Sequence, residues 1–74
     1  MKVYVACYQG TDTEEILGVF TDIEKARESI YKDYKSTEIG YDTNLEVTED
    51  NRIYVAQEGM YYDEWLVVET ELYN

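Results

Sequence analysis

The residues of this 74-residue chain that could do chemistry are almost all carboxylates, because the sequence holds 17 Asp and Glu, one Cys and no His. Without an imidazole the chain lacks the usual general base near neutral pH, the commonest zinc ligand and any Ser-His or Cys-His nucleophile pair. Cys7 lies on the apolar side of an alternating segment, which is typical of a small buried hydrophobe. We therefore expect no catalytic residue and no enzymatic activity.

Carboxylates can also bind metal ions, but their spacing here does not favour it. Four acids between residues 42 and 50 are loosely clustered, without the alternating Asp/Asn spacing and closing Glu of a calcium loop. Asp63 and Glu64 form a second pair, and the four glycines are too scattered to build a phosphate-cradling loop. Acids at strand ends are usually solvated, so we expect no metal and no cofactor.

The charge of the chain is strongly negative and uneven. The net charge is −11, and residues 38–74 hold ten acidic side chains against the single base Arg52, a net of −9. Such a surface repels nucleic acid and anionic lipid, which both need cationic counterparts. It attracts basic proteins and speeds encounter with them. The alternative is that the acidity serves solubility alone.

Aromatic residues are the second unusual feature, with nine Tyr and one Trp. Tyr and Trp are enriched at contact surfaces, although a small domain can also use tyrosine to fill a thin core. The segment 59–65 mixes three aromatic residues and a methionine with acids. Glu69 and Glu71, two apart on a predicted strand, would lie roughly 6.7 Å apart on one face and could imitate nucleic-acid phosphates. The candidate partner-binding residues are Glu49, Asp50, Tyr61, Tyr62, Asp63, Glu64, Trp65, Glu69 and Glu71.

A helix is the element with the strongest local signal. Thr21 is the predicted N-cap, with its hydroxyl accepting from the amide of Glu24 and the Glu24 carboxylate reaching back to the Thr21 amide. The helix is expected over residues 22–35. Its apolar stripe consists of Ile23, Ala26, Ile30 and Tyr34.

Alternating and apolar runs predict five strands around this helix, with a bulge or close packing at Gly18. The expected fold is a single α+β domain over residues 1–74, with one helix packed on a small antiparallel sheet in the order β-β-α-β-β-β. The side chains of Tyr4, Tyr8, Tyr54 and Trp65 are expected on the wet face. A turn is expected over residues 58–63. The predicted strands are 2–8, 15–20, 45–48, 52–57 and 64–72, and the predicted core is Val3, Val5, Phe20, Ile23, Ile30, Ile53, Val55, Leu66 and Val68.

Four segments together resemble a group of small proteins from bacteria and their phages. They are the Val-Tyr-Val at 3–5, the Ile-Leu-Gly-Val-Phe-Thr-Asp at 16–22, the Glu-Lys-Ala at 24–26 and the Glu-Thr-Glu-Leu at 69–72. Residues 36–63 depart from the pattern. The resemblance implies the α+β fold and a phage source. The group has no assigned activity, so no functional residue is carried over.

Two functions are consistent with these observations. The first is an acidic protein-binding module, phage- or prophage-encoded, that modulates a basic nucleic-acid-handling host protein by charge and shape, including nucleic-acid mimicry. The second is a self-associating protein, a homodimer for example, that uses an edge strand such as residues 45–48 and a tyrosine-rich sheet face. With one cysteine and no apolar membrane span, the expected location is the cytoplasm, that of the host for a phage protein.

Overall fold

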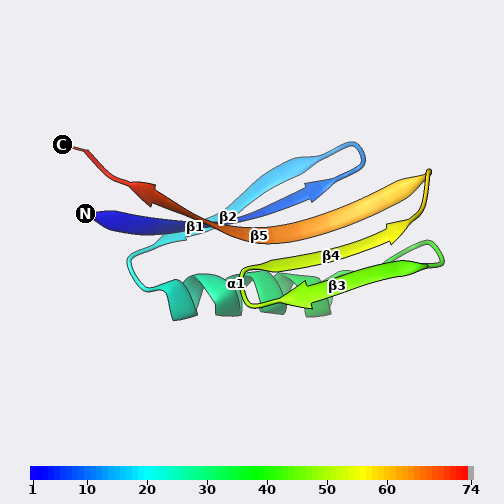
Figure 1. Cartoon of the computed structure of the whole chain (residues 1–74), viewed down its shortest axis with the longest axis horizontal. Coiled ribbons are helices and arrows are strands. Elements are labelled where there is room, and N and C mark those ends of the chain that lie inside the picture. The colour runs from blue at the N-terminus through cyan, green and yellow to red at the C-terminus, as the bar shows by residue number, and fades with distance from the viewer. Residues whose placement is uncertain (74) are drawn as a thin grey trace.

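The computed structural model describes residues 1–73, which form one helix and five strands (Figure 1). Their order along the chain, β-β-α-β-β-β, and the packing of the helix on an antiparallel sheet confirm the predicted α+β fold. The elements are β1 (Lys2–Gly10), β2 (Glu14–Phe20), α1 (Ile23–Ser36), β3 (Leu45–Glu49), β4 (Arg52–Gln57) and β5 (Tyr61–Glu71).

The sheet is antiparallel throughout, in the order β2-β1-β5-β4-β3. The first and last strands are neighbours in its middle, paired from Lys2 opposite Glu71 to Gly10 opposite Asp63. This pairing brings the β1–β2 loop beside the start of β5. The molecule is elongated, 43 × 20 × 17 Å, and α1 lies along one side of the sheet (Figure 1).

The strand β2 contains the irregularity predicted at Gly18. Its register against β1 shifts between Ala6 and Cys7, directly beside Gly18. A Cβ on Gly18 would lie 2.8 Å from the ring of Phe20. Both expected features, a bulge and a close packing neighbour, are therefore present at this glycine.

The β4–β5 turn is tighter than predicted. Gly59 adopts a φ of +80°, which glycine adopts without steric cost. The amide of Met60 donates to the carbonyl of Gln57 at 3.0 Å. Tyr61 consequently pairs with Gln57 as the first residue of β5. The expectation of a turn over residues 58–63 is therefore wrong, because the last three of these residues already belong to the strand.

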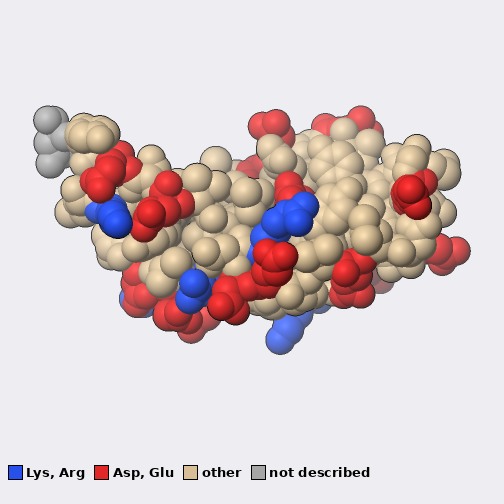
Figure 2. Space-filling model, in the orientation of Figure 1, with Lys and Arg blue, Asp and Glu red and all other residues tan. Residues whose placement is uncertain are grey.

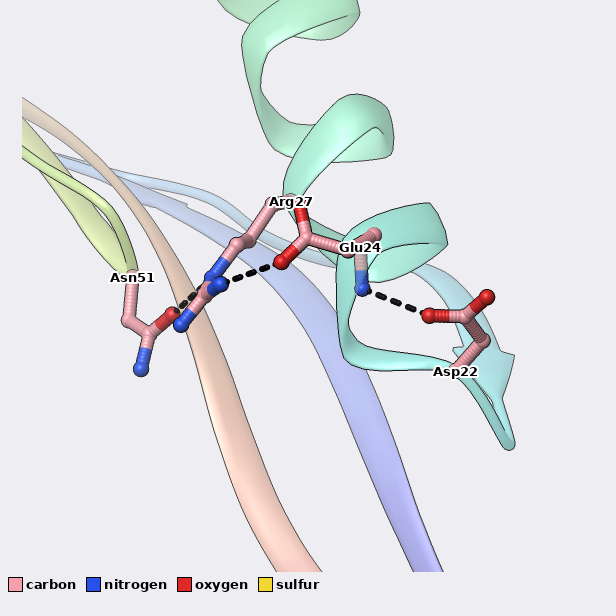
Figure 3. A network of polar contacts seen from close by, with 4 residues as sticks. All are labelled: Asp22, Glu24, Arg27 and Asn51. Carbon is pink, nitrogen blue, oxygen red and sulfur yellow. Dashed lines mark hydrogen bonds and ion pairs between the residues drawn. The ribbon is translucent and has the colours of Figure 1, made fainter.

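The N-cap of α1 is Asp22 rather than the predicted Thr21. One carboxylate oxygen of Asp22 accepts from the amide of Glu24 at 2.9 Å. The Glu24 carboxylate accepts from Arg27 at 2.6 Å, and Nε of Arg27 donates to Oδ1 of Asn51 at 2.7 Å (Figure 3). The Asp22 side chain is a favoured N-cap acceptor for the amide of Glu24, so it takes the cap position that was predicted for Thr21. The resulting network joins the first turn of the helix to the β3–β4 turn.

The core lies between α1 and one face of the sheet, and the helix buries its predicted apolar stripe there. Ala26 and Ile30 are fully buried, while Ile23 and Tyr34 pack at the edge of the core. On the sheet side, Ile53 and Val55 of β4 are buried as predicted. The buried cluster consists of Ala6, Ala26, Ile30, Ile53, Val55, Trp65 and Val67.

Trp65 is the largest buried side chain, and its expected position on the wet face is wrong. Its ring lies between those of Tyr8 and Tyr34, with centroids 5.2 Å away in each case. Its indole N–H donates to Oδ2 of Asp33 at 2.8 Å. A buried indole needs such a partner. Tyr4 also packs against this core, so of the four aromatic residues expected on the wet face only Tyr54 is there.

The inward and outward faces of β1 and β5 are the reverse of the prediction. Ala6 pairs with Val67 beneath the helix, so the alternating side chains of Val5, Leu66 and Val68 point to the opposite face. Both faces of these strands are apolar, and an alternating pattern then does not say which face the helix covers. Of the remaining predicted core residues, Val3 is buried and Phe20 packs at the edge of the core.

Candidate functional site

Glu49 and Asp50, two of the predicted partner-binding acids, lie where β3 turns into β4. Both are exposed, and the carbonyl of Glu49 accepts from the hydroxyl of Tyr31 on α1 at 2.9 Å. The length of β4, six residues or about 20 Å, separates them from the β4–β5 turn. The fold therefore does not bring these acids to the exposed tyrosines of β5.

Asp63 and Glu64 are engaged within the fold. The two oxygens of Asp63 accept from the hydroxyls of Tyr8 and Tyr41, the latter at 2.6 Å. Glu64 is paired with Arg52 at 2.5 Å. The expectation that these carboxylates are free surface charges is therefore wrong. They hold neighbouring segments of the chain together.

Glu69 and Glu71 are exposed on the same side of β5, as predicted, but each has a cationic neighbour. Glu69 lies 3.6 Å from Nζ of Lys2, and Glu71 lies 3.4 Å from the N-terminal ammonium. Exposed pairs contribute little to stability, yet they offset the local negative charge. Glu69 also lies about 23 Å along β5 from Tyr62 at the usual rise per residue. These glutamates and the tyrosines therefore do not form one surface.

Tyr61 and Tyr62 are the predicted binding residues that the structure leaves exposed, and as consecutive residues of β5 their side chains point to opposite faces of the sheet. Their side chains are 45% and 36% exposed, whereas Trp65 is 0% exposed and cannot serve as a surface anchor. Tyr61 stacks on Tyr41 with centroids 5.3 Å apart. Tyr62 stacks on Tyr54 with centroids 6.2 Å apart. Each exposed ring therefore rests on a second ring that limits its motion.

The tyrosines beneath this surface are held in their neutral form. Burial, together with the hydrogen bond to Asp63, raises the pKa of Tyr8 to about 12. The same causes raise the pKa of Tyr41. Both phenols therefore keep their protons at neutral pH and continue to donate to Asp63. Tyr41 in this way fixes the segment between α1 and β3 against the start of β5.

Two open hollows adjoin the exposed tyrosines. One, of about 340 Å³, is lined by residues 9–14 and Tyr62. The other, of about 300 Å³, is lined by residues 57–62 together with Leu45, Tyr54, Ala56 and Thr11. Thr11 and Tyr62 line both hollows, and the amide of Tyr62 donates to the Thr11 hydroxyl at 3.0 Å. The two hollows are therefore adjacent.

We call this region the acidic aromatic end; it consists of Met60, Tyr61, Tyr62, Asp12, Glu14 and Glu58. Met60 is 61% exposed, and the three acids are exposed as well. Among the described residues, no Lys or Arg lines either hollow. Figure 2 shows acidic and no basic side chains at this end of the molecule on the face in view.

Sequence reasoning did not find the acids of this end. Asp12 lies in the β1–β2 loop and Glu14 is the first residue of β2, 47 residues or more before the tyrosines in the chain. Only the pairing of β1 with β5 brings them together. Met60 did carry a signal, since it lies within the mixed aromatic and acidic segment 59–65.

Cys7 shows no sign of an activated thiol. Burial raises the pKa of its thiol, and the nearby carboxylates of Glu64 and Glu14 raise it further. Among residues 1–73, no three His, Cys, Asp or Glu side chains lie together as metal ligands. Within the same range, α1 is too short and too polar to cross a membrane.

No family model matches this chain, and no curated protein or solved structure matches it. The resemblance to small bacterial and phage proteins therefore stays a prediction.

Proposed function

We propose that this protein is a non-enzymatic binding module that docks on a basic protein surface through its acidic aromatic end. The observation that carries the proposal is the exposure of Met60, Tyr61 and Tyr62 beside three carboxylates. Exposed aromatic residues grouped with a methionine are typical of the centre of a protein interface. Carboxylates around them favour a partner with Lys and Arg at its contact surface.

The chemistry of the site suits arginine in particular. A guanidinium can stack on the face of a tyrosine while it donates to a carboxylate at the rim. The protein already makes such a contact internally, since the guanidinium carbon of Arg52 lies 4.9 Å from the centre of the Tyr54 ring. Tyr62 stacks on the same ring. An arginine of the partner could use Tyr62 in the same way.

The site is also rigid before binding. Tyr41 supports Tyr61 and is itself held by Asp63, and the Thr11 hydroxyl fixes the backbone of Tyr62. Rings that are already ordered lose little conformational entropy when a partner binds. The acidic aromatic end therefore favours docking of a preformed surface.

The partner class follows from the same chemistry. Proteins that handle nucleic acid present clusters of Lys and Arg to phosphates, and these clusters would complement the carboxylates here. Direct binding of nucleic acid is disfavoured by the net charge of −11. The proposed action is therefore to occupy the basic surface of a nucleic-acid-handling protein. We assign this role to the acidic aromatic end rather than to Glu69 and Glu71.

A peptide pair tests this proposal. Fluorescence anisotropy would compare labelled oligoarginine and oligolysine of equal length on the wild type and on Tyr62→Ala. We expect tighter binding of oligoarginine, weaker binding at higher salt, and a loss of the arginine preference in Tyr62→Ala. Equal affinity for both peptides, unchanged by the substitution, would show that the rings take no part.

A further inference from the structure

The sheet ends at β3 on one side, and the backbone of that strand is open. β3 is the last strand in the order β2-β1-β5-β4-β3, and within residues 1–73 it pairs with β4 alone. Figure 1 shows β3 at the margin of the sheet. An edge strand presents unpaired N–H and C=O groups to any strand that approaches. The free edge of β3 is therefore a place where an extended chain can be added.

The backbone groups of β3 that point outward are those of Glu46 and Thr48. In an antiparallel ladder, successive residues turn their N–H and C=O groups to opposite edges of the strand. The amide of Val67 in β5 donates to the carbonyl of Asn51, directly before β4, at 2.8 Å. The first residue of β4 therefore bonds toward β3, and its register partner Glu49 bonds back toward β4. By the same alternation, Thr48 and Glu46 point away from the sheet.

The contacts that α1 makes with β3 leave these outward groups free. Tyr34 donates to the side chain of Glu46 at 3.0 Å, and Tyr31 donates at 2.9 Å to the carbonyl of Glu49, which faces β4. Within the described part of the chain, no hydrogen bond is made to the backbone N–H or C=O of Glu46 or Thr48 on the outer side. Both residues are exposed. Two donors and two acceptors are thus available to a partner chain.

The other edge of the sheet is protected, whereas β3 is not. β2 has the register shift beside Gly18, and such bulges are a common protection of edge strands, as are Pro and Lys. β3 keeps an unbroken register from Leu45 opposite Ala56 to Glu49 opposite Arg52, and it contains neither Pro nor Lys. An added strand can therefore follow its whole length.

The charge of β3 selects the kind of chain that is added. The strand contains Glu46 and Glu49, is followed by Asp50, and has no basic residue. Because Glu46 and Glu49 are three residues apart, they lie on opposite faces of the strand. Arg52 lies opposite Glu49 in register, but it is paired with Glu64 at 2.5 Å. A cationic side chain on either face of an added strand therefore meets a carboxylate.

The same charges reject a second copy of β3 as the occupant. Two copies side by side would bring four glutamates and no base to one ladder, and like charges opposed across strands destabilise the pairing. Each copy also carries a net charge of −11. A basic extended segment gains main-chain hydrogen bonds from the open edge and ion pairs from its glutamates.

We propose that the basic partner contributes an extended segment, rich in Arg or Lys, that adds to the sheet as a strand beside β3. This inference rests on the proposed function, because it assigns how the same partner is held. The segment runs along the five residues of β3, about 17 Å. At one end it meets Glu49 and Asp50, and at the other it meets Leu45, which lines a hollow of the acidic aromatic end. One segment thus joins two acidic regions that the fold keeps apart.

Methylation of a peptide backbone tests the main-chain bonds. Fluorescence anisotropy would compare octa-arginine with two derivatives, one N-methylated at every second residue and one at every residue. Alternate methylation leaves one edge of an extended chain free to pair, and full methylation leaves none. We expect the alternately methylated peptide to bind like octa-arginine and the fully methylated peptide to bind at least tenfold more weakly. Equal affinity of all three peptides would overturn the proposal.

A matched pair of variants places the segment on β3. Thr48→Pro removes an outward amide that β4 does not use, a position at which an edge strand tolerates proline, whereas Thr48→Ala keeps the amide. We expect Thr48→Pro to bind octa-arginine at least fivefold more weakly and Thr48→Ala to bind it like the wild type. Circular dichroism checks each fold, and the peptide series on the wild type decides if Thr48→Pro does not fold. A folded Thr48→Pro chain that binds like Thr48→Ala would overturn the proposal.

Tyr62→Ala separates this inference from the proposed function. Weaker binding in Tyr62→Ala with unchanged binding in Thr48→Pro would keep the acidic aromatic end and overturn the added strand. Weaker binding in Thr48→Pro with an intact arginine preference in Tyr62→Ala would support the added strand and contradict the acidic aromatic end. Sedimentation equilibrium checks for the other occupant. A mass near twice 8.8 kDa that Thr48→Pro abolishes would assign β3 to a second copy and overturn the proposal.

Discussion

The hydroxyl of Tyr41 donates a hydrogen bond of 2.6 Å to Oδ2 of Asp63, and the ring of Tyr41 stacks on Tyr61. The segment before β3 is thereby fixed to the start of β5. Tyr8 donates to the other oxygen of the same carboxylate, so Asp63 joins three segments of the chain. The acidic aromatic end depends on this carboxylate for its shape, although Asp63 itself does not face a partner.

Removing the Tyr41 hydroxyl tests that dependence. Tyr41→Phe keeps the ring that stacks on Tyr61 but removes the bond to Asp63. We expect the free energy of unfolding in urea to fall by about 1.5–3 kcal/mol, the usual contribution of a hydrogen bond to a charged group. Tyr73→Phe, at a position 86% exposed, is the control and should leave stability unchanged. Equal stability of both variants would contradict the role given to this bond.

Alkaline pH should weaken the fold through the same two phenols. The pKa of Tyr8 is raised to about 12 by burial and by Asp63, and the pKa of Tyr41 is raised in the same way. A folded-state pKa above the unfolded value gives stabilisation that is complete below the unfolded pKa of about 10 and is lost as the pH rises further. We therefore expect the urea midpoint to fall steadily between about pH 10 and pH 12. A flat midpoint over that range would show that the phenols titrate normally.

Absorbance at alkaline pH gives a second measurement of this effect. Because the pKa values of Tyr8 and Tyr41 are raised, the absorbance of ionised phenol should include a late fraction that appears only as the protein unfolds. Asp63→Asn removes the negative charge that opposes ionisation of Tyr8 and Tyr41. The late fraction of tyrosine ionisation should therefore shift to lower pH in this variant. Late ionisation that persists unchanged in Asp63→Asn would assign the shift to burial alone.

The contact between Trp65 and Asp33 is expected to stabilise the whole domain. Asp33→Ala leaves the indole N–H without its partner and should lower the free energy of unfolding by about 1–3 kcal/mol. Asp33→Asn retains an acceptor oxygen and serves as the matched control. Trp65→Ala should cost about 3–5 kcal/mol, enough to unfold a domain of marginal stability. Urea melts followed by circular dichroism measure all three, and an Asp33→Ala chain as stable as Asp33→Asn would contradict the role of this bond.

The order of the elements could be predicted from sequence because it depends on local patterns. The buried face of the helix was predicted correctly, because its apolar stripe, which includes Ala26 and Ile30, lies on one side. The same holds for the strand that buries Ile53 and Val55. In β1 and β5 both sides are apolar, and the choice of face depends on which side the helix covers. Trp65 decides that choice, because its ring fills the space beneath α1 and its N–H reaches Asp33.

The candidate site could be predicted only in part. Tyr61 and Tyr62 are exposed because the Gly59 turn places them at the first positions of β5. Two of the acids that accompany them, Asp12 and Glu14, depend on strand pairing between residues far apart in the chain. The capture of Asp63 by Tyr8 and Tyr41 depends on it as well. Net charge in the sequence did not say which carboxylates are free and which are bound within the fold.

The most direct test of the acidic aromatic end compares two double variants that remove the same charge from opposite ends of the molecule. Asp12→Asn with Glu58→Gln changes the acidic aromatic end, and Glu69→Gln with Glu71→Gln changes the far end of β5. The measurement is the affinity of each for oligoarginine at one fixed low salt concentration. We predict that the first double variant binds about tenfold more weakly than the second, a difference of about 1.4 kcal/mol. Equal weakening in the two would contradict the account, because binding would then depend on net charge alone.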